Sequence, residues 1–471
     1  MISFALAKAL LLATALEPAS PATGANGMPS RDDSGARLQA RPPAGADAGA
    51  VSQQPKPSPF PASEPGSPPT APPKPSPFPT SEPGPPPPAP PKPSPFPTSE
   101  PEPGPPSPAA PPAASPNVFN PRLTVVGDGL YRYDSRAVLD SAGDRVDGRF
   151  LLREAELDMR VAVDPFADGV AIISLGQTQP GQFDAAVEEG YVTIKRLPIP
   201  LLDQPPLGLS FTAGRFRAET GRVNRLHLHD LPQPTRPLAI EEFFGEDGYV
   251  GDGLSAHVFL PFPLDDDSAV ELVAQALTGG GAAVAAGSSR KPAFVGNLRW
   301  FRTFANSHNV DLAFIFFYGR TDSEGRLGAY TYSLDFLYKW RPLRLGEFHS
   351  FVLGAQALMS RRRFVDAADA ASSGERTSKP WGGFAFAQIQ LARPLYLGVR
   401  ADDTRTIRDD RLRRRAVGGY LTWYPSEFLR FRAGYEHLWS DIADEDGRHS
   451  AFAQIDFVMG AHPPEPFWVN K

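Results

Sequence analysis

The stretch GAYTYSLDFLYKW, residues 328–340, alternates apolar and polar side chains over its whole length. One set of positions carries mostly aromatic residues, and the other carries threonine, serine, Asp335 and Lys339. Successive side chains of a β-strand point to opposite faces, so this stretch predicts a strand with one apolar and one ionisable face. It is also about twice as long as a typical globular strand.

The same period of two recurs from Leu123 to Gly460. It predicts an all-β fold, a closed transmembrane antiparallel β-barrel of about sixteen strands whose apolar face meets lipid. We expect the strands near residues 122–133, 149–163, 169–178, 185–196, 207–218, 251–262, 268–277, 292–303, 309–320, 328–340, 348–361, 381–392, 395–403, 412–424, 427–438 and 448–460. We expect the polar faces to line a lumen, with these groups facing it: Glu154, Glu156, Asp158, Arg160, Asp335, Arg430, Arg432, Glu436 and Asp456.

A soluble β-sandwich would also alternate, but two further patterns favour the membrane. Short and long connections mostly alternate between the expected strands, as they do in barrels with short periplasmic turns and long external loops. An even strand count then leaves both termini in the periplasm. Aromatic residues gather toward strand ends, as interfacial girdles require: Tyr131, Tyr133, Tyr318, Tyr338, Trp340, Trp423 and Tyr424.

Composition divides the chain into three parts. Residues 1–22 resemble a signal peptide, with Lys8 before a short apolar run. Residues 23–116 are a polar linker, expected to be disordered, and residues 117–471 form the expected barrel. The chain has no cysteine, which excludes disulfides and thiol chemistry, and its net charge of -6 gives no nucleic-acid footprint.

A proline-rich unit repeats within residues 55–111, with Lys56, Lys74 and Lys92 at equivalent positions. Dense proline favours an extended polyproline II chain without a core. The segment is either an inert linker or a spacer that reaches peptidoglycan or a periplasmic protein.

Four runs carry a resemblance to a known family: VFNPRLTVVGDG (118–129), FLLREAELDMRVAVDP (150–165), the segment 207–261 and FAQIDFVMGAHPPEPF (452–467). Together they resemble porin-type outer-membrane proteins, in particular the phosphate-selective porin O/P type and related porin-like outer-membrane receptors. The resemblance covers about residues 117–467. It implies a trimer and an external loop that folds into the channel, although the chain shows no row of lysines of the kind that phosphate porins use.

The long connection 219–250 is the segment that the resemblance assigns to the constriction. Opposed acids and bases in a narrow pore sort solutes by charge. The alternative is that these groups satisfy the loop's own backbone. The candidate constriction residues are Arg215, Arg217, Arg222, Arg225, His227, His229, Asp230, Glu241, Glu242, Glu246 and Asp247.

His227, His229 and Asp230 form an H-x-H-D run, in which both imidazoles can share one strand face. Two ligands are not a metal site, and the third and fourth ligands would have to come from elsewhere in the chain. We therefore expect no metal and no cofactor. Arginines near 361–363 and 411–415 suit phosphate groups of lipopolysaccharide or a permeating anion, or form a solvated rim.

These patterns favour an outer-membrane channel for passive or weakly selective diffusion of small hydrophilic solutes or ions, in contact with the bilayer and lipopolysaccharide. The alternative is a barrel anchor whose proline-rich arm tethers the outer membrane to the cell wall or a partner. A gated receptor would need a folded plug before the barrel, which the polar linker does not provide. No Ser/His/Asp arrangement or carboxylate pair supports an enzyme.

Overall fold

The computed structural model describes residues 121–138, 149–179, 182–200, 202–262, 265–278, 291–322, 324–365, 374–460 and 466–469. The expected signal peptide and proline-rich linker, residues 1–116, lie outside these residues. The described strands are β1 (Arg122–Asp134), β2 (Arg149–Asp164), β3 (Ala167–Gln179), β4 (Gln182–Ile194), β5 (Ser210–Arg217), β6 (Val250–Leu260), β7 (Ser268–Thr278), β8 (Ala293–Phe304), β9 (His308–Arg320), β10 (Gly328–Trp340), β11 (Phe351–Val365), β12 (Glu375–Ser378), β13 (Trp381–Ala392), β14 (Leu395–Arg405), β15 (Arg413–Ser426), β16 (Leu429–Ser440) and β17 (Arg448–Gly460). The described helices are η1 (Pro206–Gly208), η2 (Val223–Arg225) and α2 (Leu238–Phe244).

The 17 strands form one closed antiparallel sheet. β1 pairs with β17, from Thr124 opposite Gly460 to Asp134 opposite Ser450, so the ring closes. β12 and β13 share one position in the ring, because each pairs with a different part of β11. Pro380, which has no N–H to donate, lies between them. The barrel therefore has sixteen strand positions and one short extra strand, which confirms the predicted fold class.

The distribution of polar and apolar side chains over the two faces of the strands is the reverse of that in a soluble protein. On β10, Thr331, Ser333 and Asp335 are buried, whereas Tyr330 and Tyr332 are 47% and 40% exposed. Polar groups thus line the interior and apolar groups cover the exterior, which is the arrangement of a membrane-spanning barrel.

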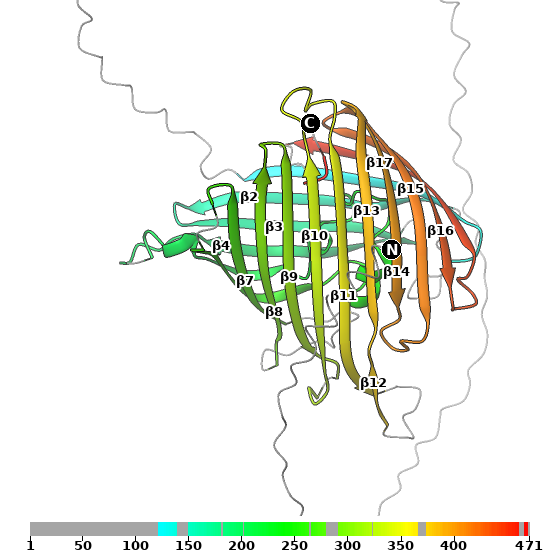
Figure 1. Ribbon diagram of the computed structural model, residues 1–471, viewed down its shortest axis with the longest axis horizontal. Helices are drawn as coiled ribbons and strands as arrows, with labels where there is room; N and C mark the ends of the chain where they lie inside the picture. Colours follow the sequence, from blue (N-terminus) through cyan, green and yellow to red (C-terminus); the bar gives the residue numbers. More distant parts are fainter. Residues whose placement is uncertain are drawn as a thin grey trace, which may run out of the picture. The chain divides into compact units, whose positions relative to one another are not determined.

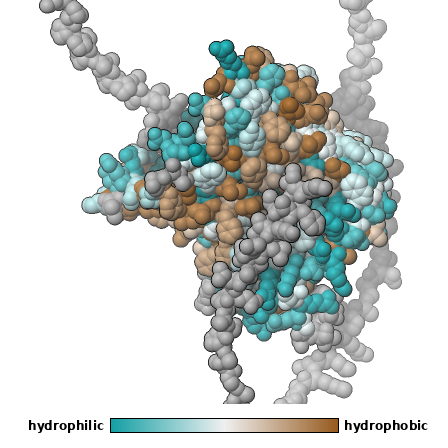
Figure 2. Space-filling view, viewed as in Figure 1, coloured by the Kyte–Doolittle hydropathy of each residue, from teal (hydrophilic) through white to brown (hydrophobic). Residues whose placement is uncertain are grey.

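Aromatic side chains stack across neighbouring strands on this exterior. The rings of Tyr318 and Tyr330 are 4.7 Å apart, and those of Phe316 and Tyr332 are 5.4 Å apart. Figure 2 shows apolar residues over the middle and upper part of the visible face and hydrophilic ones toward its lower end. The prediction was wrong for Tyr424, which is buried, because its position in β15 points inward, unlike that of Trp423.

The two ends of the barrel differ in their connections. At the turn end, uppermost in Figure 1, several strand pairs are joined tightly, as between β8 and β9 or β13 and β14. The opposite end, which we call the loop end, carries the connection 218–249 between β5 and β6. Among the described residues, no helix is both long and apolar enough to cross a membrane.

Candidate functional site

The connection 218–249, which we call the inner loop, folds back into the barrel. The backbone N–H of Arg222 donates to Asp335 on β10 at 2.6 Å, and His229 Nδ1 lies 3.1 Å from Glu154 Oε2 on β2. Its helix α2 packs on β13, β14 and β15, and is visible behind the front strands in Figure 1. A segment that contacts β2, β10 and β14 of one closed sheet can only lie inside it.

Asn224 joins the two ends of the inner loop. Its Nδ2 donates to the carbonyls of Ala218 at 2.8 Å and Tyr249 at 3.1 Å, and its Oδ1 accepts from the N–H of Tyr249 at 2.7 Å. Gly248 beside it has φ of 77°, and a Cβ there would lie 2.3 Å from Asn224 Oδ1. Only glycine fits this close return of the chain.

Arg236 holds the middle of the inner loop from within. Its guanidinium donates to the carbonyls of Glu246 at 2.9 Å, Val223 at 3.1 Å and Leu226 at 3.2 Å. Burial lowers the pKa of Arg236 to about 10. For this residue, satisfying the loop's own backbone is the role that the contacts describe.

An apolar face of the inner loop packs on an apolar patch of the inner wall. The ring of Phe317 on β9 meets Phe244 at 5.8 Å and Tyr249 at 5.3 Å, both edge to face. The rest of this patch comes from strands β7 to β9 and is fully buried: Leu277, Ala293, Val295, Ala313 and Ile315. Burial of this area stabilises the loop inside the barrel.

Charged groups tie the loop to the wall at several points. Arg222 Nη1 donates to Asp311 at 3.0 Å, and Arg299 on β8 also donates to Asp311, at 2.8 Å. On the other side, Arg400 pairs with Asp402 and with Glu436, both at 2.7 Å, and donates to the carbonyl of Thr235.

His227 is surrounded by three carboxylates. Its Nδ1 lies 3.1 Å from Glu156 and 3.0 Å from Glu188, and its Nε2 lies 2.8 Å from Glu189. Glu188 and Glu189 are neighbours on β4, yet both reach His227, because the β3–β4 ladder skips Glu188 at a bulge. A strict alternation cannot predict this, and the sequence analysis missed both residues.

His229 stacks on His227, with ring centroids 5.7 Å apart. Burial by itself lowers the pKa of His229, but the charges of Asp230, Glu156 and Glu154 outweigh it and raise that pKa to about 10. The pKa of His227 is likewise raised, against burial and Arg217, by its three carboxylate partners.

The segment 466–469, which follows β17, also lies inside the barrel. The indole N–H of Trp468 donates to the carbonyl of Asp230 at 2.7 Å, and Gln388 on β13 donates to the carbonyl of Trp468 at 2.8 Å. The guanidinium groups of Arg430 and Arg432 lie 5.7 Å and 5.5 Å from the Trp468 ring centroid. Sequence reasoning did not predict this segment, because nothing in it alternates.

The inner loop and the segment 466–469 cover only part of the inner wall. Eight lumen-facing residues from β10 around to β1 are 5% exposed or less and form what we call the covered wall: Asp128, Asp335, Gln356, Gln388, Asp402, Thr422, Arg432 and Gln454. Six lumen-facing residues on β2 and β4 to β8 are half-buried or exposed, unlike buried neighbours on the same strands such as Glu156 and Gln275, and form the open wall: Arg160, Thr193, Thr212, His257, Glu271 and Arg299. Direct pairing of Thr193 with Thr212 and of Glu271 with Arg299 places each pair on one face.

The candidate constriction residues fall into three groups. Arg217, Arg222, His227, His229, Glu241 and Glu242 are held within the loop–wall contacts. Arg225, Asp230, Glu246 and Asp247 keep more exposure, and Arg225 pairs with Glu219 at 3.2 Å while 52% exposed. Arg215 stands apart, beside Asp252 of β6.

All but one of the predicted lumen-facing residues are buried, and the exception is Arg160. Arg160 is 43% exposed at its side chain and pairs with buried Asp158. The others are all buried in the interior: Glu154, Glu156, Asp335, Arg430, Arg432, Glu436 and Asp456. At the rim, Arg411 pairs with Asp409 and Arg413 with Asp403.

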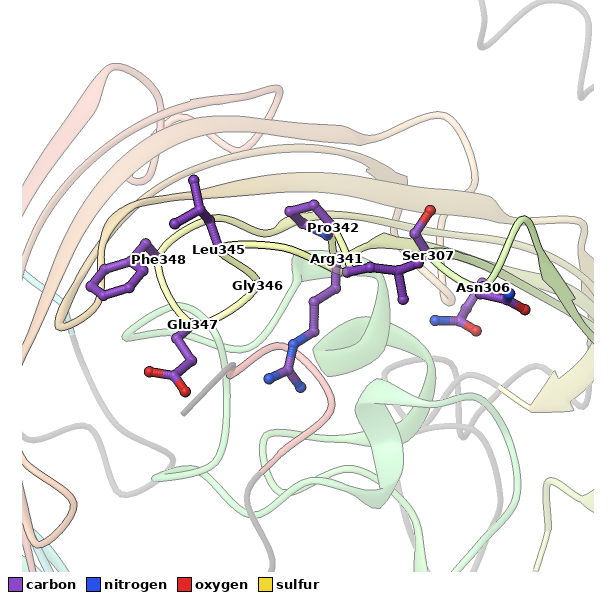
Figure 3. Close-up of a pocket in the computed structure, with 10 residues that line it drawn as sticks. Asn306, Ser307, Arg341, Pro342, Leu345, Gly346, Glu347 and Phe348 are labelled. Atoms are coloured by element: carbon purple, nitrogen blue, oxygen red, sulfur yellow. The ribbon is translucent and has the colours of Figure 1, made fainter.

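A pocket of about 590 Å³ lies at the turn end, between Asn306 and Ser307 of the β8–β9 turn and the segment 341–348. In Figure 3, Arg341 and Glu347 point to one side of that segment and Leu345 points to the other. None of the residues that line the pocket is a candidate site residue of the sequence analysis.

No known family model matches the chain. An uncharacterized protein of Aquifex aeolicus (strain VF5) is 31% identical over 114 residues, which are 24% of this chain. The match spans only 21% of that relative's own length.

Among solved structures, three similar chains are outer-membrane proteins. OmpT of Vibrio cholerae with loop L8 deleted has a TM-score of 0.45 and 9% identity, covering 72% of this chain and 99% of its own. The outer membrane channel DcaP of Acinetobacter baumannii has 0.46 and 10%, covering 72% and 97%. OmpF of Salmonella typhi, in complex with daunomycin, has 0.46 and 11%, also covering 72% and 97%.

Proposed function

We propose that the chain is an outer-membrane channel through which small hydrophilic solutes or ions diffuse along the open wall. The observation that carries this proposal is the difference in exposure around the inner wall. Residues of the covered wall are 5% exposed or less, whereas the side chains of Arg160, Glu271 and Arg299 are 43%, 24% and 31% exposed.

The inner loop narrows this path. Glu219 accepts from Asn297 of β8 at 3.4 Å, and Gln275 of β7 accepts from the N–H of Glu219 at 2.9 Å. Arg225, paired with Glu219, therefore lies at the edge of the loop that borders the open wall. Charges of both signs line the proposed path, Arg225 on the loop and Glu271 and Arg299 on the wall, and they favour weak rather than strict ion selectivity.

In this proposal the exterior meets lipid, the turn end faces the periplasm and both termini lie there. The charged rim meets lipopolysaccharide. Diffusion channels of this kind need no cofactor, and the trimer that the porin resemblance implies remains a prediction.

Thiol labelling tests the path directly, because the chain has no cysteine of its own. Thr212→Cys on the open wall and Thr422→Cys on the covered wall form a matched pair. With the purified full-length protein in a planar bilayer, a charged, water-soluble thiol reagent should reduce the conductance of Thr212→Cys and leave Thr422→Cys unchanged. Equal responses would contradict the path, and a protein that never conducts would favour the alternative of a barrel that anchors the proline-rich arm.

A further inference from the structure

The inner loop and two wall strands bring one imidazole and three carboxylates together. Donor atoms of Glu154, Glu156, Glu188 and His227 all lie within 4.8 Å of one another. We propose that these four residues, which we call the loop–wall cage, bind a divalent first-row transition ion such as Zn²⁺. The ion would join the inner loop to β2 and β4.

One buried oxygen of the cage has no hydrogen bond. The Glu156 side chain is 2% exposed, and its Oε2 is a fully buried atom that accepts none. Its near neighbour His227 Nδ1 is equally close to Glu188, and Nδ1 carries at most one proton, which cannot point at both carboxylates. A buried, unsatisfied carboxylate oxygen is costly, and a cation bound between the imidazole and the carboxylates removes that cost.

The second nitrogen of His227 is arranged as in known metal sites. Metal-binding histidines almost always donate the N–H that does not face the metal to a carboxylate or carbonyl, which fixes the ring. Here His227 Nε2 lies 2.8 Å from Glu189 Oε1, leaving Nδ1 directed into the cage. Arg217 in turn holds Glu188 at 2.5 Å and donates to the carbonyl of Asp247 at 2.6 Å.

The donor set selects the class of ion. Imidazole suits Zn²⁺ and neighbouring transition ions, and carboxylates complete such sites. Bonds of about 2.1 Å place tetrahedral ligand atoms about 3.4 Å apart. His227 Nδ1 lies 3.1 Å from Glu156 and 3.0 Å from Glu188, within about 0.4 Å of this spacing. Glu154, which now contacts His229, would have to turn toward the ion.

Charge also favours a cation. Four carboxylates lie in or beside the cage, those of Glu154, Glu156, Glu188 and Glu189, and even with Arg217 and both imidazoles of His227 and His229 charged they outnumber these cations by one. The sequence analysis expected no metal because the H-x-H-D run supplies two ligands only. The remaining ligands come from β2 and β4, far away in the sequence.

The test uses untagged full-length protein, folded in detergent and stripped with a chelator. Titration calorimetry with Zn²⁺ should show about one ion bound per chain. Glu156→Gln and His227→Gln should each weaken binding by more than about tenfold. Co²⁺ in place of Zn²⁺ should give the intense visible bands of a four-coordinate site, and these bands should be lost in both variants.

His257→Gln is the matched control, because His257 also pairs with a glutamate, Glu271. In the described contacts His257 has no second carboxylate partner. Its Zn²⁺ affinity should equal that of the parent. Unboiled gel migration shows whether each variant has formed its barrel. Absence of stoichiometric binding of both ions, or binding that neither cage substitution weakens in a folded barrel, would overturn the proposal and leave an ion-pair network closed by protonated imidazoles.

Discussion

The open wall and the covered wall are built from the same residue types, yet they treat charge differently. On the covered wall, Arg400 is 1% exposed and has two carboxylate partners and a carbonyl. On the open wall, Arg160 keeps 43% of its side-chain exposure and pairs with one carboxylate, that of Asp158. A charge removed from water needs full pairing, whereas one that water reaches does not. The difference shows that polarity alone does not define the channel: coverage by the inner loop and the segment 466–469 does.

The largest effect should come from breaking a pair on the covered wall. Arg400→Met leaves Asp402 and Glu436 buried without their cation, which should lower the free energy of unfolding by about 3–5 kcal/mol. Arg225→Met, at the exposed edge of the loop, should cost less than about 1 kcal/mol. Urea unfolding in detergent, followed by tryptophan fluorescence, measures both. Similar losses of stability in Arg400→Met and Arg225→Met would show that the covered wall and the exposed edge of the loop do not differ in how strongly they depend on ion pairing.

A charge on the lipid face should cost somewhat less. Leu334→Arg and Phe336→Arg, near the middle of β10, should each lower the free energy of unfolding by about 2–4 kcal/mol. Thr212→Arg on the open wall is the proper control and should be tolerated. Asp335→Arg is unsuitable as a lumen control, because Asp335 is buried and paired with Arg222. A tolerant Phe336→Arg would place that face away from lipid.

A pH effect should follow from Glu241 in α2. Burial raises the pKa of Glu241 from 4.5 to about 7, helped by Glu436 and Glu246 and opposed by Arg414 and Arg400. Because the folded state holds this proton more tightly than the unfolded state does, stability is greatest below pH 4.5 and falls as the pH rises to 7. The loss should be at most about 3 kcal/mol.

Glu241→Gln isolates this effect from other titrating groups. The difference in free energy of unfolding between variant and parent should grow between about pH 5 and about pH 8. A difference that stays constant with pH would mean that Glu241 is solvated and that α2 covers the wall loosely.

The smallest effect should be on selectivity. Arg225→Gln changes the energy of a passing monovalent ion by about 1 kcal/mol and should shift the reversal potential toward cations. Glu242→Gln should shift it little, because Glu242 lies against Ile407 and Arg414 on the covered side. The Arg225 shift should shrink at molar salt, where the Debye length is about 3 Å. A larger shift from Glu242→Gln would place the solute path on the other wall.

Alternation was sufficient to predict the strands. β10, β13 and β17 begin and end at the predicted residues, and most other boundaries differ by a few residues, because a membrane barrel repeats one simple pattern. The short strand β12 was not predicted. Long connections also indicated the segment that becomes the inner loop, and parity placed the acids and arginines of β2, β10, β16 and β17 on the polar faces of their strands.

The site could not be derived in the same way. Glu188 reaches His227 through a bulge, and Arg225 differs from Arg222 only in what the loop's fold leaves exposed. Such features depend on contacts between residues far apart in the sequence, and no local period records them.

Trp468 has a consequence for the order in which the molecule assembles. Its segment follows the last strand, and its contacts span Asp230 of the inner loop, Gln388 of β13 and Arg430 of β16. The site that holds Trp468 forms only after these strands have curved around the inner loop. Docking of Trp468 therefore follows closure of these strands around the loop, and burial of its indole contributes to an intrinsic fluorescence signal of that step.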